Sequence, residues 1–231
     1  MKLSVIIPCY NESKNLPYLL KRIDELILLN IIEVIIVDNG SSDNTFSIIK
    51  DYEKKNFNVK CLRIEKNIGY GNGILEGLKI AEGEILSWTH ADIQTDPKDL
   101  INGLEFFDSK NNKMFVKGLR YGRPIDERFF TISMSLFCSF ILRKFLWDIN
   151  AQPTMFNASL FSTWVNPPND FSLDLFAYFE AIKNGYKIQR FPVNFGLRLF
   201  GKSSWNINFL SKLRFIIRSI KFTFKLANRK I

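Results

Sequence analysis

The sequence predicts an α/β protein with a mostly parallel central sheet and helices on both of its faces. Four segments of strand length occur in the first hundred residues: short apolar runs at 3–8, 33–38 and 84–90, and an alternating segment at 58–64. Segments with apolar residues at helical spacing lie between these runs, as expected for alternating strands and helices. Continuous apolar runs are typical of parallel strands, because such sheets are covered on both faces.

Three helices are expected between these strands. The first has apolar residues at helical spacing, namely Leu16, Leu19, Leu20, Ile23, Leu26 and Ile27. The second is TFSIIKDYEKK (45–55), and the third begins near Ile74 and ends before Gly83. Ligands of such sheets bind beyond the carboxyl ends of the strands. We therefore expect the site among the polar residues at 8–12, 38–43 and 90–94.

The second half of the chain alternates less regularly. KMFVKGLR (113–120) and YKIQRFPV (186–193) predict strands. Helices are expected over the apolar stretch 129–146 and over SLDLFAYFEAIKNG (172–185), which Gly185 ends.

The chain is expected to divide into a domain of residues 1–205 and a basic amphipathic segment of residues 206–231. The segment carries one apolar face, formed by Phe209, Leu213, Ile216, Ile217, Ile220 and Phe224. Its basic residues lie largely elsewhere, and no acidic residue follows Glu180. This pattern is typical of a helix that lies on an anionic membrane surface. A helix docked on the domain with a solvated basic rim is the alternative.

Composition limits the partners and the compartment. The net charge of +9 favours anionic partners, such as phosphorylated ligands or a membrane surface. Nucleic acid is not expected, since the basic residues cluster in the tail and no aromatic-basic platform accompanies them. The three cysteines form no paired motif, which favours a reducing compartment. No signal peptide or membrane-spanning run is found. We expect a cytoplasmic protein, peripherally associated with the inner face of the cell membrane.

Seven segments occur in an order that identifies a family. They are SVIIPCYNE (4–12), VDNGSSDNT (37–45), NIGYGNGILEGLKIAEGE (67–84), HADIQTDP (90–97), GLRYGR (118–123), WDINAQPTMF (147–156) and RFPVNFGLRLFGKS (190–203). Together they resemble family 2 glycosyltransferases of the GT-A fold, with dolichol- and polyprenol-phosphate sugar synthases as near relatives. The resemblance implies an inverting transfer of a sugar from a nucleoside diphosphate. The implied acceptor is polyprenyl phosphate or a lipid-linked saccharide of cell-envelope polysaccharide or lipopolysaccharide.

The resemblance implies a set of residues that bind the nucleotide-sugar donor: Pro8, Tyr10, Glu12, Val37, Asp38, Asn39, Gly71, Ala91, Arg120, Arg198 and Lys202. Asn39 stands where the family often has an aspartate, and Ser204 stands where the synthases have a lysine, for which Lys202 could substitute. Guanidinium groups suit phosphate oxygens. The alternatives are turn or cap roles for Glu12 and Asp38, loop flexibility for Gly71, and surface charge for the two arginines.

The resemblance also implies a divalent metal ion, Mn²⁺ or Mg²⁺, at residues 90–94. The family usually has Asp-x-Asp there, but this chain has His90 and Asp92, followed by Gln94. The three side chains could face one ion if the segment is extended. Imidazole favours Mn²⁺ over Mg²⁺. The alternative is a structural His90, with Asp92 alone on the metal.

On the acceptor side, Asp148 and Asp174 match acidic positions of the family, and Asp148 is the slightly preferred catalytic residue. A hydroxyl acceptor needs a general base, whereas a phosphate is already ionised. A helix-dipole role is the alternative for Asp174. A different class of function also stays open: a catalytically silent member of the fold that binds nucleotide-sugars as a membrane-associated partner.

Overall fold

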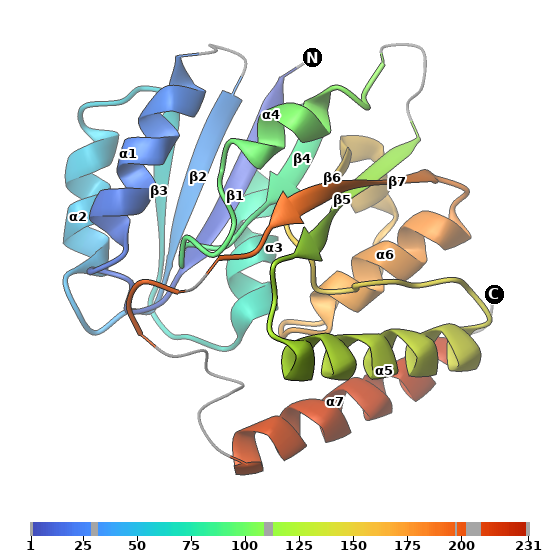
Figure 1. The fold of residues 1–231 in the computed structure, drawn as a ribbon. Helices are drawn as coiled ribbons and strands as arrows, with labels where there is room; N and C mark the ends of the chain where they lie inside the picture. The colour runs from blue at the N-terminus through green and yellow to red at the C-terminus, as the bar shows by residue number, and fades with distance from the viewer. Residues whose placement is uncertain (1, 29–31, 109–112, 197, 202–208, 230–231) are drawn as a thin grey trace.

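The computed structural model describes residues 2–28, 32–108, 113–196, 198–201 and 209–229 (Figure 1). One seven-stranded sheet has the order β3-β2-β1-β4-β6-β5-β7. Its strands are β1 (Leu3–Cys9), β2 (Ile32–Asn39), β3 (Val59–Ile64), β4 (Ile85–Trp88), β5 (Met114–Tyr121), β6 (Thr154–Asn157) and β7 (Lys187–Asn194). Strand β1 pairs in parallel with β2 and β4, β2 with β3, and β5 with β7, whereas β6 runs antiparallel between β4 and β5. The prediction of a mostly parallel sheet is confirmed.

Helices cover both faces of the sheet. They are α1 (Leu16–Ile27), α2 (Thr45–Glu53), α3 (Tyr70–Ile80), α4 (Asp99–Leu104), α5 (Ile125–Leu142), α6 (Leu173–Lys183) and α7 (Phe209–Ala227), with a 3₁₀ helix η1 (Ala158–Thr163) after β6. Helix α5 begins after Pro124 and ends at Leu142, so it starts and stops four residues earlier than the sequence predicted. Arg143 adopts a left-handed conformation directly after it, which ends the helix.

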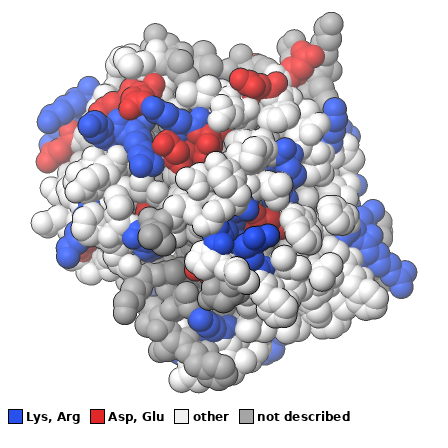
Figure 2. Space-filling view, in the orientation of Figure 1, with Lys and Arg blue, Asp and Glu red and all other residues white. Residues whose placement is uncertain are grey.

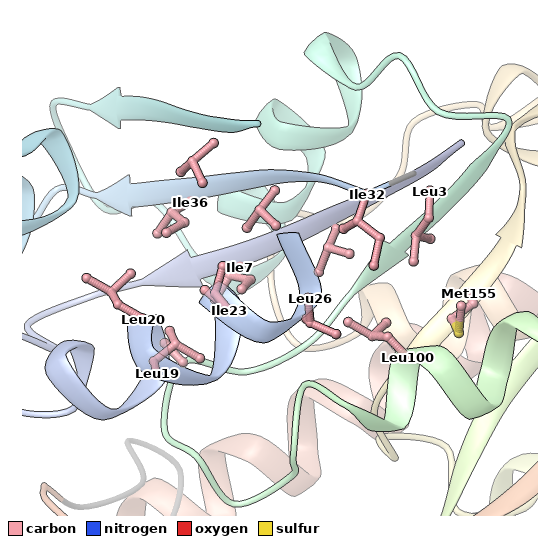
Figure 3. Packing of buried hydrophobic residues seen from close by; sticks show 14 of the residues in the cluster. Leu3, Ile7, Leu19, Leu20, Ile23, Leu26, Ile32, Ile36, Leu100 and Met155 are labelled. Atoms are coloured by element: carbon pink, nitrogen blue, oxygen red, sulfur yellow. The ribbon is translucent and has the colours of Figure 1, made fainter. Parts of the chain in front are cut away.

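Two apolar layers hold the helices to the sheet. One face of the sheet packs against α1 and α4, where Leu19, Ile23 and Leu26 of α1 lie on Ile7 and Ile36 (Figure 3). The layer on the opposite face receives α3, α5 and α6 and contains the large side chains of Trp88, Phe115 and Phe156. These aromatic residues contact one another, with ring centroids 5.7 Å and 6.0 Å apart.

Helices α5 and α7 lie side by side at one end of the molecule (Figure 1). Phe137 and Phe224 meet edge to face, and Thr223 and Leu226 are buried. Leu213 and Ile217 of α7 remain about two-fifths exposed. None of the helices in the described part of the chain combines the length and apolar character needed to cross a bilayer. The division at residue 205 falls among residues outside the described ranges and stays a prediction.

Candidate active site

A cleft of about 810 Å³ opens beyond the carboxyl ends of β1, β2 and β4. Many of the predicted site residues line it: Pro8, Tyr10, Glu12, Asn39, His90, Ala91, Asp92, Gln94, Arg120, Asp174 and Arg198. Val37, Asp38 and Asp148 are buried behind the lining, and Gly71 lies within the first turn of α3. Lys202 lies outside the described residues. The parallel register of the three strands brings these segments to one edge of the sheet.

Hydrogen bonds join the loop after β1 to the loop after β2. Asn11 N donates to Ser41 Oγ at 2.9 Å, and Glu12 N donates to Thr45 Oγ1 at 2.9 Å. Asn15 donates through its side chain to the Glu12 carboxylate at 2.5 Å. Burial raises the pKa of Glu12, and hydrogen bonding from Asn15 opposes that shift. Glu12 is thus a fixed acceptor at the wall of the cleft.

Asp38 and Asn39 have different places at the end of β2. Asp38 is fully buried, and its Oδ1 accepts from Ser41 N at 3.1 Å, which is a turn-closing contact. Asn39 lines the cleft and donates to Gly69 O at 2.9 Å. Its Oδ1 is buried and accepts no hydrogen bond from the described residues. Asn39 is therefore the residue of this pair that a ligand in the cleft can reach.

Glycines bring α3 close to a neighbouring loop. A Cβ on Gly69 would lie 2.2 Å from Asn169 O, and one on Gly71 would lie 2.7 Å from Asp170 O. Gly69 also has a φ of +140°, which favours glycine. These two glycines allow the start of α3 to approach the backbone of residues 168–170 closely.

The metal-site candidates lie in a bent segment. Ile93 has a φ of +62°, so residues 90–94 are not extended as the prediction required. His90, Asp92 and Gln94 still all line the cleft. Burial lowers the pKa of His90, so its imidazole is neutral at pH 7. Among the described residues, no three His, Cys, Asp or Glu side chains are grouped closely enough to hold a metal by themselves.

The chemical types of the His90, Asp92 and Gln94 side chains nevertheless suit a divalent cation. It offers a neutral imidazole nitrogen, a carboxylate and an amide oxygen, a mixture that suits Mn²⁺. The Asp92 carboxylate already has two partners, because Oδ1 accepts from Gln94 N at 3.2 Å and Oδ2 accepts from Arg198 Nη2. A metal ion on Asp92 therefore has to compete with Arg198.

Arg198 belongs to the segment after β7, which crosses the cleft mouth. Its Nη1 lies 3.9 Å from Glu12 Oε1, so one guanidinium stands between Glu12 and Asp92. The segment is held by Gln94, which exchanges hydrogen bonds of 2.7 Å and 3.2 Å with Gly196. Farther along, the Phe200 ring lies 5.9 Å from that of Tyr18.

A second cationic group faces the cleft from β5 and the segment after it. Arg120 and Arg123 both line the cleft, and both approach the buried Asp148. Asp148 accepts from Arg120 N and Arg120 Nε at 3.0 Å, and Arg123 Nη1 is 3.7 Å away. Although burial alone would raise the pKa of Asp148, the Arg120 guanidinium holds it below its usual value. Asp148 therefore orients two cations, and its oxygens are not free to accept a proton. The centre of the face in Figure 2 shows basic and acidic side chains side by side.

Asp174 lies in the first turn of α6, at the floor of the cleft. Its Oδ1 accepts from Gln152 Nε2 at 2.8 Å and Trp88 Nε1 at 3.2 Å, and Lys117 Nζ is 3.6 Å away. These contacts of the carboxylate are all made through Oδ1. A carboxylate anchored through one oxygen beside a cleft has the arrangement of a general base.

Lys117 was not among the site residues predicted from the sequence. A signal was available, because side chains alternate along a strand and Lys117 shares a face with the apolar Phe115. A lysine on the buried face of a strand needs a partner.

Comparison with known proteins assigns the class. The family model described as glycosyl transferase family 2 matches residues 4–165. The chain belongs to this family, which confirms the predicted enzyme class. A dolichol-phosphate mannosyltransferase of Pyrococcus furiosus is 35% identical over 121 residues, covering 52% of this chain and 34% of that protein. An undecaprenyl-phosphate 4-deoxy-4-formamido-L-arabinose transferase of an Enterobacter species is 32% identical over 102 residues, covering 43% and 31%. The alignments thus span about a third of these relatives' length.

Solved structures confirm the GT-A fold. The mannosyltransferase PcManGT of Pyrobaculum calidifontis, in complex with GDP-Man and Mn²⁺, has a TM-score of 0.69 at 18% identity, covering 97% of this chain and 64% of that one. Glucosyl-3-phosphoglycerate synthase of Mycobacterium tuberculosis, with Mn²⁺, UDP and phosphoglyceric acid, has a TM-score of 0.71 at 15% identity, covering 96% and 78%. At these identities the likeness shows the fold alone.

Proposed function

We propose that this protein transfers a sugar from a nucleoside-diphosphate sugar to a lipid-linked saccharide or a polyprenyl phosphate in cell-envelope glycan assembly. The observation that carries the proposal is one cleft that brings together Glu12, Asn39, Asp92 and Arg198, with Asp174 at its floor. Family membership supports the same class of reaction, as does the similarity to a dolichol-phosphate mannosyltransferase and an undecaprenyl-phosphate sugar transferase.

In this proposal the donor lies across the ends of β1, β2 and β4. Asn39 and Glu12 offer hydrogen-bond acceptors to base and ribose. The Arg198 guanidinium donates hydrogen bonds to the diphosphate oxygens. His90, Asp92 and Gln94 would hold a divalent ion, which offsets the charge that develops on the leaving diphosphate. The solved mannosyltransferase and synthase are both complexes with Mn²⁺, which supports this assignment.

The acceptor enters from the side of α5 and α7. A small apolar pocket between these helices, lined by Phe130, Met134, Leu175 and Phe215, adjoins the cleft and shares Phe130 and Phe215 with it. Apolar walls of this kind suit a hydrocarbon chain. Arg120 and Arg123 stand at the junction with the cleft and suit an acceptor-side phosphate. Helix α7 would rest on an anionic membrane surface, where lipid carriers are found.

For a hydroxyl acceptor, Asp174 is the candidate base. Its carboxylate takes the hydroxyl proton while the acceptor oxygen forms the new bond to the anomeric carbon of the sugar. The bond between that carbon and the diphosphate oxygen breaks, and the nucleoside diphosphate leaves with the electron pair. Attack from the face opposite the leaving group inverts the anomeric configuration.

A thermal-shift panel tests donor binding first. UDP-, GDP-, dTDP- and CMP-sugars are compared with and without Mn²⁺, in the wild type and in Asp92→Asn. Asp96→Asn is the matched control, because Asp96 lies on the same loop but pairs with Arg22 at 3.5 Å on the surface. We expect a metal-dependent shift that Asp92→Asn removes and Asp96→Asn retains. A shift of equal size in Asp92→Asn overturns the metal assignment.

Transfer itself is then measured with the selected donor and a membrane lipid extract. Formation of a glycosylated lipid supports the proposal. Donor binding without any product, with either Mn²⁺ or Mg²⁺, favours the catalytically silent binding protein instead. The replacement of the usual aspartate by His90 is the observation that keeps that second function under test.

A further inference from the structure

Lys117 is a fully enclosed charged group of the described chain beside the cleft. It lies in β5, is fully buried, and pairs in register with Thr154 of β6 and Arg190 of β7. The alternation of side chains along β5 directs Lys117 and Phe115 to the face that α6 covers. An aliphatic residue would fill this position without the cost of burying an ammonium group.

The Lys117 ammonium has two partners, and one of them lines the cleft. Nζ donates to Thr154 Oγ1 at 2.5 Å and lies 3.6 Å from Asp174 Oδ1. That same oxygen accepts from Trp88 and Gln152. Three side chains, from β4, β5 and the segment before β6, thus converge on one carboxylate oxygen, which fixes the direction of the other.

We propose that Lys117 is a positioning residue for sugar transfer: its buried ammonium keeps the Asp174 carboxylate ionised and turned toward the acceptor. The proposal rests on the proposed function, in which Asp174 accepts the proton of an acceptor hydroxyl. Without a counter-charge, a carboxylate at the floor of a buried site favours its protonated form, which cannot act as a base.

The charges around Lys117 agree with a protonated ammonium group at neutral pH. Burial lowers the pKa of Lys117 to about 8, while Asp174 of α6 and Asp148 before β6 raise it, and Arg190 of β7 and Arg120 of β5 lower it. The group is therefore still mainly an ammonium at pH 7. Asp174 is the carboxylate nearest to it among the described residues.

The first test is the pH profile of nucleoside diphosphate release, with water as the acceptor hydroxyl. UDP-glucose, GDP-mannose and dTDP-rhamnose are each supplied to the wild type, Lys117→Met, Lys117→Arg and the control Thr154→Val, which removes the other Nζ partner. We expect the acid side of the kcat/KM profile to move up by about one pH unit in Lys117→Met. Lys117→Arg, which keeps the charge, and Thr154→Val should retain the wild-type profile.

A double-mutant cycle separates this role from a structural one. If Lys117 acts through Asp174, Lys117→Met lowers the rate in the wild-type background and has no further effect in Asp174→Asn. Equal loss in both backgrounds, or an unshifted profile in Lys117→Met, overturns the proposal. The double variant removes both charges, so it also provides a folded reference if Lys117→Met alone does not fold.

An NMR titration tests the ion pair between Lys117 and Asp174 without any enzymatic turnover. The ¹³Cε signal of Lys117, identified by its loss in Lys117→Arg, should titrate near pH 8 and move to lower pH in Asp174→Asn, which removes the attracting carboxylate. An unchanged midpoint overturns the pairing, whatever donor the protein uses. Absence of nucleoside diphosphate release from the wild type, with the NMR shift present, would instead count against the proposed function.

Discussion

Arg198 donates a hydrogen bond to Asp92 across 106 positions of sequence, and the same guanidinium lies 3.9 Å from Glu12. The cation of the segment after β7 thus occupies the space between two carboxylates that were predicted to bind the donor and its metal. A diphosphate would offer Arg198 a second anionic partner and release Asp92. Binding of metal and of nucleotide should therefore be coupled through this one side chain.

The first prediction concerns that coupling. In Arg198→Gln without nucleotide, Mn²⁺ should bind Asp92 about tenfold more tightly than in the wild type, because a nearby cation no longer competes. Nucleoside diphosphate binding should weaken in the same variant. Mn²⁺ affinity is measured by electron paramagnetic resonance of the free ion. Arg22→Gln, which removes a surface pair with Asp96, is the control and should leave both affinities unchanged.

Wild-type affinity for Mn²⁺ should rise when UDP or GDP is added, and this increase should be smaller in Arg198→Gln. If the variant and the wild type bind Mn²⁺ equally well without nucleotide, Arg198 does not compete for Asp92 and the coupling is absent.

The convergence of Arg198 and Asp92 could not be predicted from sequence, although each residue was a candidate. The resemblance implies that each residue belongs to the site, but the contact between them depends on how the segment after β7 returns across the sheet. The strands of the first half were predictable, because each is a short apolar or alternating segment bounded by polar residues. Strand β6 was missed: TMFN has only four residues and no periodicity of its own, and its pairing with β4 and β5 is set by tertiary contacts.

The identity of the metal should depend on His90. Replacing it by aspartate recreates the Asp-x-Asp pattern of the family and supplies oxygen in place of nitrogen. Mg²⁺ prefers oxygen ligands, whereas imidazole suits transition metals. The donor-induced thermal shift of the wild type should be larger with Mn²⁺ than with Mg²⁺, and His90→Asp should bring the two shifts closer together. The same ratio in both proteins would mean that His90 is not a ligand.

Asp148 should stabilise the fold in a pH-dependent manner. Its pKa is held below the usual 3.8 by Arg120, so its contribution is fully present above that value and is lost as pH falls through the lower, folded-state pKa. Asp148→Asn leaves two largely buried guanidinium groups without their carboxylate and should cost about 3 kcal/mol of unfolding free energy at pH 7.

Urea unfolding of Asp148→Asn and the wild type at several pH values measures this difference. The gap should be constant from pH 5 to 8 and shrink below about pH 4. Asp51→Asn is the control, since Asp51 pairs only with an exposed lysine and should change stability little. A gap that stays unchanged down to pH 2 would contradict the assigned role of the ion pair.

Helix α7 should bind anionic membranes through its exposed apolar side chains. Leu213 and Ile217 lie one turn apart, are about two-fifths exposed, and are accompanied by Arg214 and Lys221. Burying such side chains in the interface is worth about 1.5–3 kcal/mol each when complete. The double variant Leu213→Ser, Ile217→Ser should therefore lose at least tenfold in partitioning onto phosphatidylglycerol vesicles in a sedimentation assay.

The wild type should bind phosphatidylcholine vesicles weakly, because the basic residues find no anionic partner there. Phe57→Ser is the matched control, since Phe57 is 91% exposed on the loop before β3, and it should bind as the wild type does. Equal binding by the double variant and this control would leave α7 as a helix that only packs on α5.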